Sequence, residues 1–437
     1  MEWAALTHGL AKLSSGDKVF PLRVAYLTQW FSPEPDGPPL WVAQALRSLA
    51  FEVHVVTAIP NYPLGVVYPG YSANRTYREE VAGFQVTRCP IYPSHDRSAL
   101  RRAVNYASFA ISASWVGRKI LKSADVTLVY SSPETAAIPA LISQTQSSTP
   151  YVLLIQDLWP ETVLETGFLN SSVVRGVAER SLSTLDRVLC NKAAHVLVIA
   201  PGMKEALVSR GVPEEKISVM FNWVDESVVF PHARTGELRA RLGVPEGELL
   251  FTFAGNHGAA QGLSAWIQAI EKVQDLKNLH FAFIGEGTEK EALRDMVATQ
   301  GLQRMYFLES LELDEYVRLA ADSDAQIVSL SDSPLFRITI PGKVQSCLAL
   351  GAAIIGSVAG DAAHIIGESR AGFIAKPDDI ADIERAIREA HSVGQTGLKK
   401  AGDAGRSYYL GHMSSEIGSK IMGEALRSAA RAGRNTQ

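Results

Sequence analysis

The alternation of apolar strand-like segments with helical segments is the feature that most constrains how this chain folds. Residues 23–27 are largely apolar and lead into a loop rich in proline, residues 40–50 repeat apolar side chains at helical spacing, and residues 51–57 are apolar again. This order predicts a βαβ unit, and nearly continuous apolar strands are typical of a parallel sheet covered on both faces. Further strands of this kind are expected at residues 126–130, 151–155 and 195–199.

The same pattern begins again near residue 249. Residues 249–254 and 279–284 are predicted strands, with a helix at residues 263–273 between them. More strands are expected at residues 305–308, 325–330 and 353–357. Because 437 residues are too many for one ordinary core, we predict an α/β protein of two doubly wound, Rossmann-like domains. Ligands of such sheets bind beyond the carboxyl ends of the strands, so a cleft between the domains is the expected site.

The domain boundaries follow from these two series. We expect an N-terminal extension at residues 1–22, a first Rossmann-like domain at 23–228, a second Rossmann-like domain at 235–401 and a C-terminal helix and tail at 402–437, within which the helix spans residues 402–430.

The composition limits which partners and which cellular compartment are expected for this chain. A net charge of −4 argues against a nucleic-acid partner. The three cysteines are widely spaced and form no CxxC motif, which suits a reducing compartment and predicts no metal site. The first residues do not resemble an export signal, and no uncharged run reaches the about 18 apolar residues of a spanning helix. We therefore expect a cytoplasmic protein, with at most peripheral contact on the inner face of the plasma membrane.

The first candidate site is the glycine-rich loop that follows residues 249–254. Gly255, Gly258 and Gly262 leave room for a ligand near the backbone, and Asn256 and Gln261 add polar side chains. A loop between a strand and a helix is where a doubly wound domain presents amides to a phosphate. The alternative is an ordinary strand-to-helix turn.

Two basic residues flank the next helix start. Arg337 and Lys343 lie on either side of Pro341, which suits the first turn of a helix that ends at Gly351. Arginine binds two oxygens at once and lysine acts as a point charge, so this pair is predicted to neutralise a diphosphate. The alternative is a pair of solvated surface cations.

The first domain offers carboxylates at a strand end. Asp157 and Glu161 follow the strand at residues 151–155 and are candidate bases or acceptor-binding groups, although they could also cap a helix. Gly37 lies in a loop whose four prolines leave few N–H donors, so it is assigned to the acceptor side or to a rigid turn. The G-x-G-x-x-G fingerprint is absent there, which weighs against a nicotinamide enzyme.

Residues 97–122 contain six basic residues and no acidic residue, with Tyr106, Phe109, Ile111 and Trp115 between them. An apolar helix with basic ends is able to lie on an anionic membrane. The alternative is a helix that packs its apolar face on the sheet.

Several segments, taken in order, resemble a known family over about residues 23–390. They are YLTQWFSPE at 26–34, IPNYPLG at 59–65, QDLWPE at 156–161, NWVD at 222–225, AGN at 254–256 with QG at 261–262, and IPGK at 340–343. Together they resemble the retaining glycosyltransferases of family 4. The most similar group builds bacterial O-antigen, capsule or colanic-acid-type exopolysaccharide and includes N-acetylfucosamine-type aminosugar transferases.

This resemblance implies a GT-B fold and a nucleotide-sugar donor, a UDP-sugar, held by the second domain. It implies transfer with retention to a lipid-linked acceptor, such as a polyprenyl-linked glycan, or to another glycan, without a cofactor or an obligatory metal. Arg337 and Lys343 are then expected to stabilise the leaving diphosphate, and Asp157 is the third catalytic candidate. Asn61, Asn222 and Asp225 are expected on the acceptor side or at the hinge.

The chain departs from the family pattern at several positions. Ile338 and Ser346 stand where many members carry two glutamates, so Ser346 is expected to bind the ribose more weakly than a carboxylate would. Asn256 and Gln261 replace the usual arginine and lysine of the glycine loop. Two alternatives therefore stay open, a nucleotide-sugar epimerase or hydrolase of the same fold and a non-catalytic scaffold of a polysaccharide assembly complex.

Overall fold

The computed structural model describes residues 21–35, 37–95, 98–161 and 172–434. The first domain contains an eight-stranded sheet with the order β3-β4-β2-β1-β5-β6-β7-β8, in which only β3 runs antiparallel to its neighbour. Its strands are β1 (Arg23–Leu27), β2 (Glu52–Ala58), β3 (Tyr77–Val81), β4 (Phe84–Cys89), β5 (Val126–Ser131), β6 (Tyr151–Ile155), β7 (His195–Val198) and β8 (Ile217–Val219).

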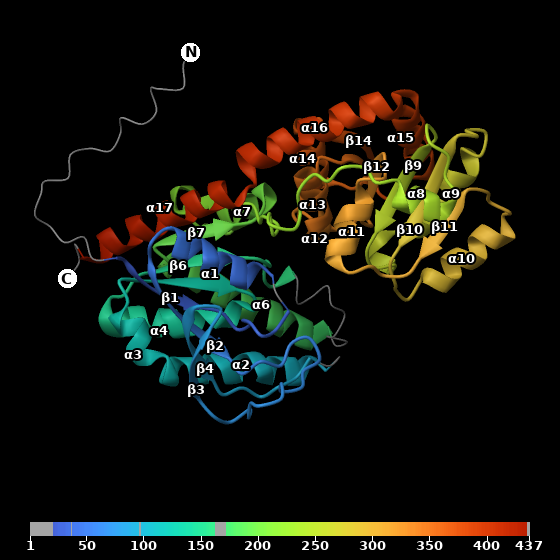
Figure 1. Cartoon of the computed structure of the whole chain (residues 1–437). Helices are drawn as coiled ribbons and strands as arrows, with labels where there is room; N and C mark the ends of the chain where they lie inside the picture. The colour runs from blue at the N-terminus through green and yellow to red at the C-terminus, as the bar shows by residue number, and fades with distance from the viewer. Residues whose placement is uncertain (1–20, 36, 96–97, 162–171, 435–437) are drawn as a thin grey trace, which may run out of the picture.

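Helices cover both faces of this sheet. Helix α1 lies on one side together with the last helix of the chain, whereas α2, α3 and α4 lie on the other side (Figure 1). The helices are α1 (Pro38–Ser48), α2 (Ala99–Val116), α3 (Arg118–Ser123), α4 (Ile138–Ser147), α6 (Ser172–Lys192) and α7 (Pro201–Ser209), with short turns η1 (Glu134–Ala137) and η2 (Glu214–Lys216).

The second domain contains a six-stranded parallel sheet with the order β11-β10-β9-β12-β13-β14. Its strands are β9 (Leu249–Ala254), β10 (Leu279–Ile284), β11 (Met305–Leu308), β12 (Ala325–Ser329), β13 (Ala353–Ser357) and β14 (Gly372–Ala375). Its helices are α8 (Glu237–Leu242), η3 (Ala259–Gln261), α9 (Leu263–Lys272), α10 (Lys290–Thr299), α11 (Leu313–Ala320), α12 (Pro334–Arg337), α13 (Gly342–Leu350), α14 (Gly360–Glu368) and α15 (Ile380–Ser392).

The chain ends in two helices rather than in the single segment predicted at residues 402–430. Helix α16 (Gly394–His412) packs on α13 and β13 of the second domain, and α17 (Ser415–Arg434) returns to the first domain beside α1 (Figure 1). Gly402 permits the first contact, since a Cβ there would lie 2.1 Å from the carbonyl oxygen of Gly351. Gly418 permits the second contact, because the absence of a side chain leaves room for the ring of Trp223.

The predicted strands are all present, each within one residue at either end. The sequence did not predict β3, β4, β8 and β14. The apolar pattern did not predict β4 because this strand carries Arg88, which is fully buried. The guanidinium of Arg88 is paired with Glu79 and donates to the carbonyl oxygens of Ser32 and Ala58. Among the described residues, no helix is both long and apolar enough to cross a membrane.

Candidate functional site

Lys343 joins the start of α13 to the glycine loop of the second domain. Its Nζ donates to Oε1 of Gln261 at 2.9 Å and lies 3.6 Å from the centre of the Phe253 ring. Its stem fills the space over Gly255, where a Cβ would lie 2.6 Å from Cε of Lys343 and where φ is +141°. The lysine and the glycine loop, two separate candidates in the sequence, are therefore in contact in the fold.

The surroundings of Lys343 favour an anion. Burial lowers the pKa of Lys343 to about 7, because desolvation disfavours the ammonium form. A bound phosphate would restore that charge, and the partial positive charge at the start of α13 would add to it. Pro341 was expected inside the first turn, but it precedes the helix with an extended backbone, as the N-cap residue. The first-turn amides of Gly342 and Lys343 come after it and have no intrahelical acceptor.

The glycine loop is hydrogen-bonded through its backbone to the end of β10 and to the loop that follows it. The amide of Gly255 donates to the carbonyl oxygen of Ile284 at 2.9 Å, and that of His257 donates to Glu286 at 2.7 Å. Gly285 is required for this approach, since a Cβ there would lie 2.0 Å from the carbonyl oxygen of Gly255. Two amides that the sequence assigned to a phosphate thus bind the neighbouring loop instead.

The rest of this loop packs closely against its own polar side chains and against Asp378, and the hydroxyl of Ser329 donates to the carbonyl oxygen of Gln261. A Cβ on Gly258 would lie 2.9 Å from Nδ2 of Asn256, so the exposed asparagine covers that glycine. Gly262 has a φ of +56°, and a Cβ there would lie 2.4 Å from Oδ1 of Asp378. The turn at Gln261 and Gly262 therefore has a fixed position directly before α9.

A cavity of about 450 Å³ opens beside this loop, at the carboxyl ends of β9 and β10. Its size falls within the range of small-molecule sites. Sequence reasoning missed Glu286, Ser310 and Tyr316 of its lining; the available signal was that the loops after β10 and β11 leave the same sheet edge as the glycine loop. The lining residues are Ala254, Gly255, Asn256, Ile284, Gly285, Glu286, Ser310, Leu311, Leu313 and Tyr316.

Arg337 has a different partner from the one expected. Its Nε and Nη2 donate to the two carboxylate oxygens of Asp332 at 2.7 and 2.6 Å, and its side chain is 57% exposed. The guanidinium hydrogen bonds lower the pKa of Asp332. Arg337 and Lys343 therefore do not share a ligand set in this state, and a bidentate contact of Arg337 with a diphosphate through Nε and Nη2 requires Asp332 to release it.

The two positions that lack the family's carboxylates lie in different surroundings. Ser346 is half-buried on α13, three residues after Lys343. Ile338 follows α12 and meets the first domain, because a Cβ on Gly202 of α7 would lie 2.7 Å from its Cγ2. Beside it, the amide of Gly202 donates to Oδ2 of Asp361 at 2.7 Å. Helix α7 of the first domain thus contacts the second domain through Gly202.

On the first domain, Asp157 lies just beyond β6. Its Oδ2 accepts a hydrogen bond from Ser132 Oγ at 2.9 Å, and burial raises its pKa. The preceding residue, Gln156, forms a reciprocal amide pair with Asn222: Asn222 Nδ2 donates to Gln156 Oε1 at 2.7 Å, and Gln156 Nε2 donates to Asn222 Oδ1 at 3.2 Å. The pair joins the end of β6 to the segment between the domains.

Glu161 belongs to an ion cluster. Nη2 of Arg210 donates to Oε1 of Glu161 at 2.6 Å, while Nη1 donates to Asp186 at 2.8 Å and to the carbonyl oxygen of Trp159 at 2.7 Å. The residues directly after Glu161 lie outside the described part of the chain. Glu161 therefore holds the loop after β6 through Arg210.

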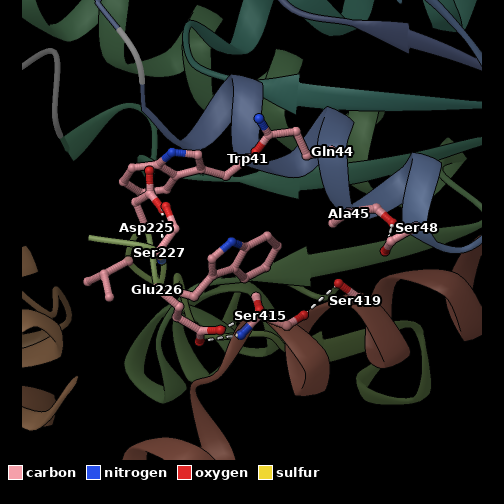
Figure 2. Close-up of a pocket in the computed structure, with 11 residues that line it drawn as sticks. Trp41, Gln44, Ala45, Ser48, Asp225, Glu226, Ser227, Ser415 and Ser419 are labelled. Carbon is pink, nitrogen blue, oxygen red and sulfur yellow. Dashed lines mark hydrogen bonds between the residues drawn. The ribbon is translucent and has the colours of Figure 1, made fainter. Parts of the chain in front are cut away.

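Asp225 closes a turn between the domains. Its Oδ1 accepts the amide hydrogen of Ser227 at 3.0 Å. It lines a separate pocket of about 280 Å³ between α1 and α17, where Figure 2 shows Trp41 of α1 on one side and Ser415 of α17 on the other. This pocket shares no lining residue with the cavity beside β9 and β10.

Asn61, which was predicted on the acceptor side, is positioned by Glu34, a residue that sequence reasoning did not single out. Its buried carboxylate accepts the amides of Phe31, Asn61 and Tyr62 at 2.8 to 2.9 Å. Burial raises the pKa of Glu34, and these amides oppose that rise. The Asn61 side chain donates to the carbonyl oxygen of Ile59 within its own loop. Gly37 has an extended backbone as the N-cap of α1, a conformation open to any residue.

Among the residues that the structure describes, no group of three or more His, Cys, Asp or Glu side chains could hold a metal ion. The expectation of a reaction that needs no metal stays a prediction.

Comparison with known proteins gives concordant matches in both halves. The profile of the glycosyl transferase 4-like domain matches residues 40–223, and that of the glycosyl transferases group 1 matches residues 248–392. The chain is 29% identical over 335 residues to the putative colanic acid biosynthesis glycosyl transferase WcaI of Escherichia coli, covering 74% of this chain and 79% of that protein. It is also 29% identical over 244 residues to the probable glycosyltransferase WbjE of Pseudomonas aeruginosa, covering 55% and 59%.

Solved structures share the fold at low sequence identity. Sucrose-phosphate synthase from Thermosynechococcus elongatus superposes with a TM-score of 0.66 at 14% identity, covering 94% of this chain and 100% of that chain. HepE of Anabaena in complex with UDP gives a TM-score of 0.65 at 14% identity, covering 93% and 100%. These likenesses show a GT-B arrangement of two Rossmann-like domains.

Proposed function

This chain is a glycosyltransferase of family 4 with the GT-B fold, and from this premise we propose that it transfers a sugar from a nucleotide diphosphate donor. The donor is a UDP-sugar, and the acceptor is a lipid-linked or other glycan of a cell-surface polysaccharide. Transfer retains the anomeric configuration. WcaI, named for colanic acid biosynthesis, supports the polysaccharide assignment, and the UDP complex of HepE supports the nucleotide.

The contact of Lys343 with Gly255 supports the proposal, because it brings a cation and a helix N-terminus against the glycine loop, and Gly255 of that loop also lines the 450 Å³ cavity. The nucleoside would occupy that cavity and the diphosphate would lie against Lys343. As the glycosidic bond breaks, negative charge grows on the leaving diphosphate. A protonated Lys343 stabilises that charge, and removing such a preorganised group costs roughly 10²- to 10³-fold in kcat.

Asp157 is the residue proposed for the acceptor side. Its place at the end of β6 and its hydrogen bond with Ser132 hold a carboxyl group in a fixed position, and burial raises its pKa. A carboxyl group of this kind is able to orient an acceptor hydroxyl or to take up its proton. We propose that the Arg337 guanidinium leaves Asp332 and then donates hydrogen bonds to the diphosphate.

A polyprenyl-linked acceptor requires the enzyme to reach a membrane surface. The proposal therefore includes peripheral contact with anionic lipid through residues 97–122, on the cytoplasmic side where nucleotide sugars are available. No cofactor is proposed, because the nucleotide sugar itself is the activated substrate.

The test is UDP release from UDP-glucose, UDP-galactose and UDP-N-acetylglucosamine, with and without a solvent-extracted fraction of lipid-linked glycans. A transferase releases UDP only with the acceptor fraction and yields a product with the donor's anomeric configuration, which NMR reads directly. Release without acceptor would identify a hydrolase, and sugar interconversion without release would identify an epimerase. No reaction in either mixture, together with no UDP binding, would identify a scaffold.

A further inference from the structure

We propose that Trp30 and Tyr62, the aromatic pair, form a subsite that stacks one sugar ring of a glycan acceptor, so that the acceptor has at least two sugar units. The inference rests on the proposed function, because it takes the hydroxyl that receives the new sugar to lie at Asp157. It deepens that function by naming the part of the acceptor that the first domain recognises.

The aromatic pair presents two rings with unpaired polar groups. The ring centroids of Trp30 and Tyr62 are 4.9 Å apart and the ring planes are tilted by 33°. Both side chains are half-buried. Within the part of the chain that the structure describes, Nε1 of Trp30 and the hydroxyl of Tyr62 have no hydrogen-bond partner, and neither atom is buried. Such a pair suits a sugar, whose C–H groups pack on an aromatic face while its hydroxyls bind the polar edges.

Glu34 holds the aromatic pair in this arrangement. Its carboxylate accepts the amide of Phe31, next to Trp30, at 2.9 Å and the amide of Tyr62 at 2.8 Å. One buried carboxylate thus fixes the loop after β1 against the loop after β2. Groups that are already held in place lose little conformational entropy when a ligand binds, so this arrangement favours binding.

The aromatic pair lies on the edge of the first sheet that faces the second domain. Helix α7 begins just after the carboxyl end of β7, and Gly202 in its first turn contacts Ile338 and Asp361 of the second domain. Strands β2, β1, β5, β6 and β7 are parallel, so their carboxyl ends lie at this same edge. Trp30 follows β1 and Tyr62 follows β2. The pair is therefore on the side of the first domain where a ligand of the cleft binds.

The strand order gives the separation between the aromatic pair and Asp157. The order β2-β1-β5-β6 places β1 two strands and β2 three strands from β6, the strand that Asp157 follows. At the spacing of neighbouring strands, these separations are roughly 10 and 14 Å. A single sugar ring is shorter than either. An acceptor whose hydroxyl lies at Asp157 therefore reaches the aromatic pair only through a second sugar.

The third ring beside the pair is uncharged, which favours a sugar over a phosphate. The ring centroid of His95 lies 5.1 Å from that of Tyr62, at an interplanar angle of 85°. Burial, and then the charge of Arg102, lower the pKa of His95 below its usual value of 6.5, so its imidazole is neutral at pH 7. The rings of Trp30, Tyr62 and His95 thus offer aromatic faces and neutral hydrogen-bonding groups.

Transfer to acceptors of defined length tests the subsite. The extracted lipid-linked glycans are separated by the number of sugars, and wild type is compared on each fraction with Trp30→Ala, Tyr62→Ala and the conservative Trp30→Phe, at saturating donor. The matched control is Tyr408→Ala, which removes a half-buried tyrosine stacked on His412 in the second domain. With two or more sugars, each alanine variant of the pair should raise KM about tenfold with little change in kcat. Trp30→Phe and the control should stay within about threefold of wild type. On one-sugar acceptors all the proteins should have the same KM.

Two further measurements separate binding from folding. UDP should stabilise every variant as it stabilises wild type, because the donor cavity lies in the second domain. Calorimetric titration of wild type with the sized glycans, released from their lipid, gives the length dependence without catalysis and without a variant, so it decides the case even where an alanine variant does not fold. Wild type should bind glycans of two or more sugars about tenfold more tightly than single sugars.

Three results would overturn the subsite. They are an equal loss on one-sugar and longer acceptors, which would assign the pair to the lipid phosphate or to packing, a fall in kcat alone, and no tighter binding of the longer glycans by wild type. Length-dependent glycan binding without stabilisation by UDP would remove the proposed function and leave the glycan subsite. UDP-sugar-dependent transfer without length dependence would do the reverse.

Discussion

Lys343 rests on the bare backbone of Gly255, at a distance that leaves no room for a Cβ on the glycine. The two residues are far apart in the sequence, and their contact joins the α13 start to the loop after β9. Because the lysine stem occupies the place of a side chain, the position of the cation depends on the glycine. The proposed donor site is defined by this contact more than by either motif alone.

Replacing Gly255 with alanine should therefore damage both the fold and the donor site. A φ of +141° strains any residue with a Cβ, and the methyl group would displace Lys343. We expect a loss of about 1–3 kcal/mol in the free energy of unfolding and weaker UDP binding. Gly247→Ala is the matched control, since Gly247 has a φ of +91° with open space around it. The control should lose stability alone, and equal loss of UDP affinity in both variants would contradict the account.

UDP affinity should fall as the pH rises above about 7. The free protein loses the Lys343 proton near that pH, because burial lowers the pKa from 10.5 to about 7, whereas a bound diphosphate would keep the ammonium charged. Binding then takes up a proton, and the dissociation constant should rise by up to about tenfold per pH unit. The phosphate group itself titrates near pH 6, below this window. Calorimetric titration of wild type and Lys343→Met should show the slope only in wild type.

The same pKa affects stability with a defined sign. The folded-state pKa of Lys343 lies below its unfolded value of 10.5, so the unfolded chain binds the extra proton between about pH 7 and 10.5. This residue therefore destabilises the free protein fully below about pH 7, and the penalty fades as the pH rises through that window. Denaturation of wild type and Lys343→Met at several pH values measures it, and a difference that does not narrow with rising pH would contradict it.

Much of the fold follows from the sequence, but the partners of its charged residues do not. Buried parallel strands such as β1, β6, β9 and β13 are continuous apolar runs, so their positions could be predicted. The contacts that side chains make in the folded chain leave no pattern in the sequence around each residue. Arg337 binds Asp332 five residues earlier, and the buried Glu34 collects amides from two loops. Ser310 and Tyr316 enter the cavity because β11 lies beside β10, which is a property of the strand order.

The amide pair of Gln156 and Asn222 should couple the first domain to the hinge. Each side chain satisfies the other's donor and acceptor, so removing one leaves the other unpaired in a part-buried place. We expect Gln156→Leu and Asn222→Leu each to cost about 1–2 kcal/mol, and the double variant to cost less than their sum. Chemical denaturation of the four proteins in this cycle gives the coupling. Additive losses would show that the two amides act independently.

Substitutions in the ion pair of Arg337 and Asp332 should affect the transfer rate without affecting stability. Both side chains are exposed and screened by solvent, so breaking the pair should leave the free energy of unfolding nearly unchanged. If Arg337 moves to the diphosphate, Arg337→Gln should lower the transfer rate, while Asp332→Asn should preserve it or raise the affinity for UDP. Steady-state kinetics on purified variants provides the comparison. An unchanged rate for Arg337→Gln would leave this residue as a surface ion pair only.

The most direct test of the donor site is a thermal-shift panel of UDP, GDP, ADP, dTDP and CMP with a chelator present, on wild type and Lys343→Ala. At about a hundred times the dissociation constant, a bound nucleotide adds about 2.7 kcal/mol, enough for a shift of several degrees. The account predicts selective stabilisation of wild type by UDP and a much smaller shift for Lys343→Ala. No shift with any nucleotide, or an equal shift in the variant, would contradict the assignment of this site to the sugar donor.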